Sequence, residues 1–431
     1  MAEILPLTAL HYDLATAGPL QALAAPPYDV IDEEQRAELA AQSPYNVVHL
    51  DLPAPPPAGD GTGDQYDHAA QLLESWRAEK ALVRDPVPAI WPLQQEYVGP
   101  DGRRRIRNGF LCRVRVEPYG AGRIRPHERT HPGPKEDRLR LTRATRANLS
   151  PIFSLYSDPG STAWSALTPH VRTTAPFAET QDADGTVNRL WRVTEPNALE
   201  TVVEAVAEAE LLIADGHHRY ETARVYAEEI GGEGPHRWVL MCLVALEDPG
   251  LTVFPTHRLV SGIESDPDRQ DALDRVIREQ FDVSELPDRG SLVPDPRGGD
   301  ERVQFGYMDA RGQVPYLLAL KEESIAEDLL GGRSEAYQRL DTAVLEAVIL
   351  KHALGMSDEQ IDHRDGLDYA RDFEEALDLL DSEEVDAGFF MAPTPIEQVQ
   401  EVAEAGESMP PKSTYFFPKV PTGLLFNPLF D

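Results

Sequence analysis

Cysteine, lysine and long apolar runs are all scarce in this chain of 431 residues. It has two cysteines, and six of its 40 basic residues are lysines. Cys112 and Cys242 allow at most one disulfide and fit no zinc-binding spacing. So few cysteines fit a reducing compartment. The longest apolar run, residues 238–246, falls short of the roughly 20 residues that a membrane-spanning helix needs. The N-terminal residues lack a signal-peptide pattern. We therefore expect a cytoplasmic protein with no membrane partner.

Acidic residues outnumber basic ones, which gives a formal net charge of -34 and a pI near 4.7. Such a protein repels nucleic acid and anionic membranes at long range, so a nucleic-acid partner is disfavoured. Several nucleotide-binding and catalytic motifs are missing as well. The sequence contains no P-loop, no G-x-G-x-x-G after an apolar run, no G-x-S-x-G elbow and no H-E-x-x-H zinc motif.

Apolar periodicity predicts a mixed α/β protein. Residues 90–97 and 106–116 flank the turn at 99–102 and predict a β-hairpin. The apolar run at 211–214 predicts a buried strand. Beyond residue 262 the pattern predicts a hairpin (303–308 and 314–320), a long helix (335–354), strands (385–391 and 413–418) and a helix (396–405). We expect an N-terminal α/β domain, residues 1–260, and a smaller C-terminal α+β domain, residues 261–431.

The strongest functional signal is the turn Asp215-Gly216-His217-His218-Arg219, which joins the buried strand to a predicted helix. Gly216 allows a ligand to approach the backbone closely. The free N–H groups at a helix start favour anions, and an arginine can grip a phosphate with two hydrogen bonds. Asp215 could act as a base or hold a metal ion. The alternative is an ordinary N-cap with histidines on the surface.

A second signal is the concentration of arginine between Arg103 and Arg146, a segment with a local net charge of +10. It contains Glu128, Arg129, Lys135 and Arg138 in and around a Gly-Pro loop, a setting that suits phosphate. Glu128 among positive neighbours could activate a hydroxyl group. The alternative is a solvated helix face whose arginines pair with acidic neighbours.

Three further clusters are weaker candidates. Pro26 to Ile31, with two prolines before Tyr28 and Asp29, predicts a rigid loop that could line a pocket. His257 and Arg258 end a strand and could contact phosphate. Lys412 and Lys419 are two of the six lysines and could reach a phosphate from the C-terminal segment.

These motifs together resemble a widespread prokaryotic family known as the domain of unknown function number one thousand and fifteen. The resemblance rests on short motifs spread over nearly the whole chain. They are residues 26–31, 127–130, 133–135, 137–138, 148–153, 214–220, 255–258 and 412–416. The resemblance does not itself imply a function.

The turn at Asp215 also resembles the nucleotide-binding motif of the ParB/sulfiredoxin-like fold, which implies such a core in the N-terminal domain. Free-serine kinases in that superfamily carry a closely similar Asp-Gly-His-His-Arg. The resemblance implies a nucleotide-dependent phosphotransferase that uses ATP or ADP with Mg²⁺ and acts on a small hydroxyl metabolite, or the reverse reaction. Asp215, Glu128 and His218 would then be catalytic. A non-catalytic nucleotide- or phosphate-binding regulator is the alternative, and a nucleic-acid enzyme or binder that uses the arginine-rich segment is a third reading.

Overall fold

The computed structural model describes residues 2–55, 63–99, 102–119, 123–127, 132–295 and 302–430. The chain divides into two compact units. The first contains Met1–Pro126, Thr130–Thr252 and Pro418–Asp431, and the second contains His127–Arg129 and Val253–Phe417. The C-terminal segment, which the sequence analysis grouped with the second domain, thus belongs to the first unit.

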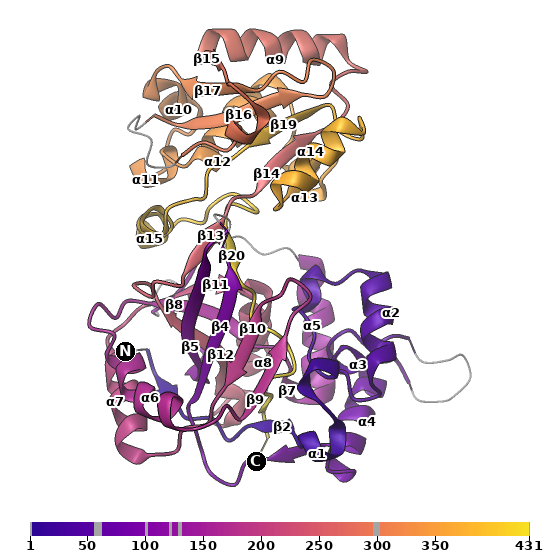
Figure 1. Ribbon diagram of the computed structural model, residues 1–431, viewed down its shortest axis with the longest axis vertical. Coiled ribbons are helices and arrows are strands. Elements are labelled where there is room, and N and C mark those ends of the chain that lie inside the picture. Colours follow the sequence, from indigo (N-terminus) through magenta and orange to yellow (C-terminus); the bar gives the residue numbers. More distant parts are fainter. Residues whose placement is uncertain are drawn as a thin grey trace. The chain divides into compact units, whose positions relative to one another are not determined.

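A nine-stranded sheet forms the centre of the first unit (Figure 1). Its order is β6 (Ile124–Pro126), β11 (Leu211–Asp215), β8 (Ile152–Tyr156), β12 (Trp238–Ala245), β5 (Arg104–Arg115), β4 (Trp91–Val98), β10 (Val187–Leu190) and β9 (Ala178–Gln181), with β1 (Ile4–Leu5) also paired to β5. The β11–β6 and β12–β8 pairs are parallel, and the other pairs are antiparallel. The predicted hairpin is confirmed as β4 and β5.

Five helices of 12 or 14 residues accompany this sheet: α4 (Gln65–Ala78), α5 (Pro132–Thr145), α6 (Thr162–Thr173), α7 (Pro196–Ala207) and α8 (His217–Ile230). Helix α5 packs between α4 and α8. Val202 and Val206 of α7 join the sheet core, as their helical spacing predicts. Shorter elements are α1 (Leu14–Ala17), η1 (Leu20–Ala22), η2 (Tyr28–Val30), α2 (Glu33–Gln42), α3 (Val48–Asp51), η3 (Pro235–Arg237), β2 (Leu10–Tyr12), β3 (Leu82–Arg84), β7 (Ala147–Asn148) and β21 (Asn427–Pro428).

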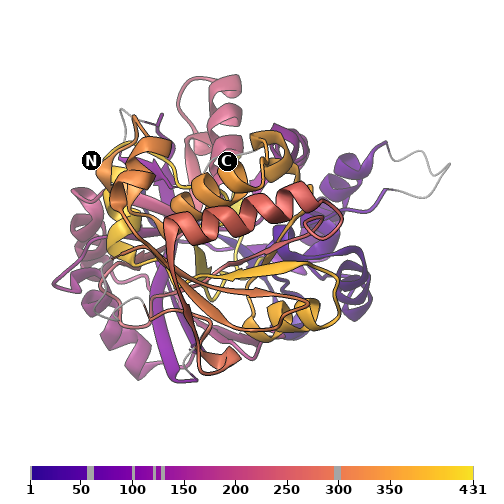
Figure 2. The same ribbon diagram turned by 90° about the horizontal axis from the view of Figure 1, so that it is seen from above.

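The second unit is built on a six-stranded antiparallel sheet. Its order is β15 (Phe281–Glu285), β17 (Tyr316–Leu320), β16 (Gln304–Asp309), β19 (Ala387–Phe390), β14 (His257–Val260) and β18 (Leu367–Ala370). Adjacent residues Phe389 and Phe390 enter separate cores on the two faces. Helix α9 (Pro267–Gln280), salmon in Figure 2, contributes to the Phe389 core, and α14 (Phe373–Asp381) contributes to the Phe390 core. Further elements between residues 252 and 417 are β13 (Thr252–Phe254), η4 (Arg289–Ser291), α10 (Glu323–Leu329), α13 (Asp358–His363), α15 (Ile396–Glu404) and β20 (Tyr415–Phe417).

The prediction of one long helix at 335–354 is wrong, because the helix is interrupted. The segment forms α11 (Glu335–Gln338), α12 (Asp341–Val344) and a π-helix, η5 (Leu345–Ala353). Leu340 interrupts it with an extended backbone (φ -71°, ψ 121°) and a fully buried side chain. Burial of Leu340 thus outweighs continuous helical hydrogen bonding. The mixed α/β class is confirmed, and no helix among the described residues is both long and apolar enough to span a bilayer.

Candidate functional site

The predicted turn lies where strand β11 ends and helix α8 begins. The β11–β8 register shifts between Ile213 and Asp215, and such a bulge re-aims the side chains beside it. Gly216 then adopts a left-handed conformation (φ 94°, ψ 30°). A Cβ added at Gly216 would lie 2.9 Å from Nε of Arg219, so the arginine packs directly on the glycine. Glycine is therefore required here by both the backbone angle and the close approach.

Asp215 is buried at the end of β11 with a cation on each carboxylate oxygen. Nη2 of Arg219 donates to Oδ2 of Asp215 at 2.5 Å, and Nζ of Lys419 donates to Oδ1. Burial alone would raise the pKa of Asp215. Lys419 and Arg219 outweigh that effect and hold the pKa of Asp215 well below its usual range. The carboxylate is therefore firmly ionised and is a weak proton acceptor.

Lys419 is held in place through its own backbone. Nε2 of Gln95 donates to the carbonyl of Lys419 at 2.9 Å, and Nη2 of Arg107 donates to the carbonyl of Pro418 at 2.5 Å. Arg107 is fully buried, donates also to Gln95, and lies 4.3 Å from the centre of the Phe153 ring. Two residues of the central sheet thus position the segment that carries Lys419 to Asp215.

A second buried arginine, Arg138 of α5, lies near Arg219. Nη1 of Arg138 is 3.2 Å from Oδ1 of Asp51, and both side chains are less than a tenth exposed. A cavity of about 40 Å³ is lined by both arginines together with Asp51 and Ser150. Burial raises the pKa of Asp51, although Arg138 and Arg219 oppose the shift. The cluster therefore holds a buried guanidinium group, that of Arg138, and a largely buried one, that of Arg219, with a carboxyl that takes up a proton more readily than usual.

The predicted loop Pro26 to Ile31 contributes to this cluster through Tyr28 and Asp29. The guanidinium of Arg138 lies 4.3 Å from the centre of the Tyr28 ring. Both Tyr28 and Asp29 interact electrostatically with Arg219. Arg219 also donates to Oγ of Ser150 at 2.9 Å and to the carbonyl of Pro151. The structure thus brings together segments that are far apart in the sequence around one arginine.

The remaining candidates of the first unit lie on helices α5 and α8. His217 is buried and lowers the pKa of Asp215, whereas His218 is partly exposed in the first turn of α8. Nζ of Lys135 is 3.7 Å from Oε2 of Glu221 on α8. Glu128 and Arg129 lie outside the described residues, so their predicted roles have no structural counterpart here.

His257 and Arg258 belong to the second unit. Nδ1 of His257 accepts a hydrogen bond from the backbone N–H of Met391 at 3.1 Å, and its ring packs near Phe390. Burial lowers the pKa of His257 to about 4. Arg258 donates to the carbonyl of Thr256 at 2.5 Å. These contacts lie within the second unit, where His257 and Arg258 belong to strand β14.

The arginine-rich segment is engaged mainly in ion pairs. Paired side chains include Arg104–Glu96, Arg115–Glu233, Arg123–Glu208, Arg125–Glu210, Arg140–Asp64 and Arg143–Glu229. Most of these side chains are partly exposed, so each pair contributes little to stability. This is the arrangement of the alternative interpretation, in which the arginines pair with acidic neighbours. Arg107 and Arg138 are buried exceptions, and both belong to the site.

Some of the site was missed by the sequence analysis. Asp51 and Arg107 were not singled out as site residues, because an ordinary helix end and a strand arginine carry no motif. Ser150 lies within the family motif 148–153 but was given no role in the site. The rarity of lysine was the signal that pointed to Lys419. Among the described residues no group of three or more metal-ligating side chains was found.

A family model described as "Protein of unknown function (DUF1015)" matches residues 4–343. The chain belongs to this family. The matched range ends before the C-terminal motif at 412–416, so it is shorter than the sequence analysis expected, and Lys419 lies beyond it. A comparison with curated protein sequences gives no match.

Several solved structures are similar at a TM-score of 0.35. One is a conserved hypothetical protein from Pyrococcus furiosus, at 17% identity over 70% of this chain and 90% of that chain. Another is a free serine kinase in complex with AMP, at 17% identity over 68% and 83%. A third is a C-terminally truncated SbnI from Staphylococcus aureus, at 11% identity over 72% and 84%. A likeness at this TM-score supports no inference about activity.

Proposed function

We propose that the chain is a nucleotide-dependent phosphotransferase that acts on a small hydroxyl metabolite. The observation that carries this proposal is the buried carboxylate of Asp215, which holds Arg219 and Lys419 together at the start of helix α8. The Asp-Gly-His-His-Arg resemblance to free-serine kinases adds the reaction class. The same geometry serves the reverse, phosphatase-like reaction.

The arrangement suits the phosphates of ATP or ADP. The first N–H groups of α8 lie at the positive end of a helix dipole, and the left-handed Gly216 opens the backbone beside them. Phosphoryl transfer depends mainly on positioning and on stabilising negative charge, which Arg219 and Lys419 would supply. Asp215 then acts as a positioning residue, because both of its oxygens already hold these cations. Lys135 and Arg138 are further candidates for phosphate contact.

A hydroxyl acceptor also needs a proton acceptor. Asp51 is the carboxyl of this cluster whose pKa is raised, so we propose it as the base in addition to Glu128, which remains a prediction from the sequence. His218, at the helix start, remains a proposed acid or base. Mg²⁺ bound to the nucleotide would supply neutralisation of phosphate charge. Such an enzyme would work in the cytoplasm, in keeping with the free thiols of Cys112 and Cys242.

A non-catalytic nucleotide- or phosphate-binding regulator is the second candidate. The specific observation in its favour is that Asp215, a catalytic carboxylate by resemblance, is paired on both oxygens and has a strongly lowered pKa. A regulator would bind nucleotide with no turnover.

Turnover separates the two candidates. We would incubate the protein with Mg²⁺ and ATP or ADP, add hydroxyl metabolites including L-serine, and follow phosphorus species by NMR. The proposal predicts a new phosphoester whose rate of formation falls at least tenfold in Asp51→Asn. The matched control is Asp67→Asn, an exposed carboxyl of helix α4, which should leave the rate unchanged. Nucleotide binding without turnover for any acceptor would instead support the regulator.

A further inference from the structure

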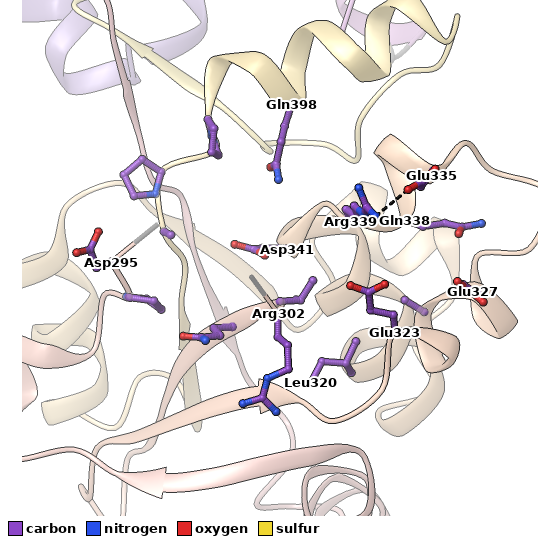
Figure 3. Close-up of a pocket in the computed structure, with 17 residues that line it drawn as sticks. Asp295, Arg302, Leu320, Glu323, Glu327, Glu335, Gln338, Arg339, Asp341 and Gln398 are labelled. Atoms are coloured by element: carbon purple, nitrogen blue, oxygen red, sulfur yellow. Dashed lines mark ion pairs between the residues drawn. The ribbon is translucent and has the colours of Figure 1, made fainter. Parts of the chain in front are cut away.

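A separate cavity lies within the second unit. Its volume is about 220 Å³, enough for about seven water molecules at roughly 30 Å³ each. Leu320, Ala326 and Ala392 line its apolar part. Gln398 of α15 and the carboxyl of Asp341 point into the space from different elements (Figure 3). The cavity thus combines an apolar wall with a few converging polar groups, as small-molecule sites do.

Asp341, the first residue of helix α12, is the unusual member of this lining. Within the described part of the chain, no hydrogen bond or ion pair of its carboxyl is found. Burial is the sole cause that shifts its pKa, which rises to about 7. Asp341 is partly buried, and its carboxyl lacks the hydrogen-bond or ion-pair partner that enclosed acidic groups normally have.

The charges around Asp341 favour a positive ligand. The acidic residues at the cavity are Asp295 before β16, Glu323 and Glu327 of α10, and Glu335 of α11. Among the described residues that line the cavity, two are basic, Arg302 and Arg339. Arg302 pairs with Asp282 at 2.8 Å, and Arg339 pairs with Glu335 at 2.7 Å. Both arginines therefore have carboxylate partners other than Asp341, and the cavity retains an excess of negative charge.

We propose that this cavity is a second small-molecule site, which binds an organic cation of the amine or guanidinium type with Asp341 as its counter-ion. The ligand's apolar stem lies against Leu320 and Ala326, and glutamine side chains such as Gln338 and Gln398 accept its remaining N–H groups. The volume fits about seven to ten non-hydrogen atoms, on the scale of a short diamine or an alkylguanidine. The site is independent of the phosphotransferase proposal.

Binding is coupled to ionisation of Asp341. Burial opposes the charge of Asp341 and raises its pKa to about 7, so without a bound cation this carboxyl is partly protonated near neutral pH. A bound cation favours the ionised form, so binding releases a proton below about pH 7. The exposed rim glutamates Glu323, Glu327 and Glu335 are solvated, so Asp341 is the group whose ionisation should change with binding.

The test uses the full chain with putrescine, agmatine and, as an uncharged control, 1,4-butanediol. Binding is measured by calorimetry at pH 6.5 in two buffers of different ionisation enthalpy. Asp341→Asn preserves shape and removes the charge. Asp328→Asn, an exposed carboxyl on α10 that does not line the cavity, is the matched control. Circular dichroism and melting curves establish that both variants fold.

The proposal predicts saturable 1:1 binding of at least one of the two cations, no binding of the diol, and proton release in the wild type. Asp341→Asn should weaken binding at least tenfold and abolish proton release, and Asp328→Asn should bind within twofold of the wild type. Absence of binding by both cations would overturn the proposal. So would equal binding by folded Asp341→Asn, because the cavity carboxyl would then have no part in recognition.

Discussion

Replacement of Lys419 by methionine should destabilise the first unit and leave the second intact. Methionine keeps the length of the apolar stem and removes the ammonium group that contacts Oδ1 of Asp215. Removing one partner of a buried ion pair costs about 3–5 kcal/mol, because the other charge stays buried. Arg219 remains on Oδ2, so we expect the lower end, about 3 kcal/mol in the free energy of unfolding.

The assay exploits an uneven distribution of tryptophan. All five tryptophans belong to the first unit, so fluorescence excited selectively at tryptophan reports the urea unfolding of that unit. Lys80→Met is the matched control, because Lys80 is exposed in the same unit. The control should change the free energy of unfolding by less than about 0.5 kcal/mol.

The pH dependence gives the sharper test. The folded pKa of Asp215 is lowered, so its ionised form contributes stability above about pH 4, the pKa of an unfolded aspartate. That contribution is lost as the pH falls through the folded pKa. In Lys419→Met the folded pKa rises and part of the contribution is already missing at pH 7. The difference in the free energy of unfolding between the wild type and Lys419→Met should therefore become smaller below about pH 4. A difference under 1 kcal/mol at pH 7, or one that is independent of pH, would refute this reasoning.

Two further predictions concern Gly216 and His257. Gly216→Ala should destabilise the first unit more than Gly231→Ala does, where Gly231 is the C-cap of the same helix. The two free energies of unfolding should differ by about 1 kcal/mol or more. Both positions have positive φ, but an added Cβ meets Arg219 only at Gly216. Equal urea midpoints by fluorescence would contradict this. His257 should stay neutral to about pH 5 in an NMR titration, because its folded pKa is about 4. The pKa of His257 is lower in the folded state than its ordinary value of 6.5, which corresponds to roughly 3 kcal/mol in the free energy of unfolding. This contribution is fully present above about pH 6.5 and is lost as the pH falls through 4. An observed pKa of 6.5 would contradict it.

Local patterns in the sequence predicted the turn well. A buried apolar run, a glycine and a helical spacing predict the β11–Gly216–α8 unit, because each depends on neighbouring residues. The partner of Asp215 could not be predicted in this way. Lys419 lies 204 residues away along the chain, and only the folded sheet brings the two together. The scarcity of lysine singled out Lys419, but nothing in the sequence connected it with Asp215.

The broken helix in the second unit has a similar origin. No glycine or proline lies between Glu335 and Leu354, so the sequence offers no reason to interrupt the helix. The interruption arises because Leu340 is buried in an extended conformation, which is a tertiary effect. It also places Asp341 at the start of α12, where its carboxyl enters the cavity.

We propose above all that Arg219 and Lys419, held by Asp215, bind nucleotide phosphates. The most direct test is calorimetry of ADP and ATP with Mg²⁺ on the wild type, on Lys419→Met and on Arg143→Ala. Arg143 pairs with Glu229 on the surface of the same unit and is the matched control. We predict saturable binding by the wild type, a loss of at least tenfold in folded Lys419→Met, and no change in Arg143→Ala. No binding by the wild type, or equal binding by Lys419→Met, would contradict the claim.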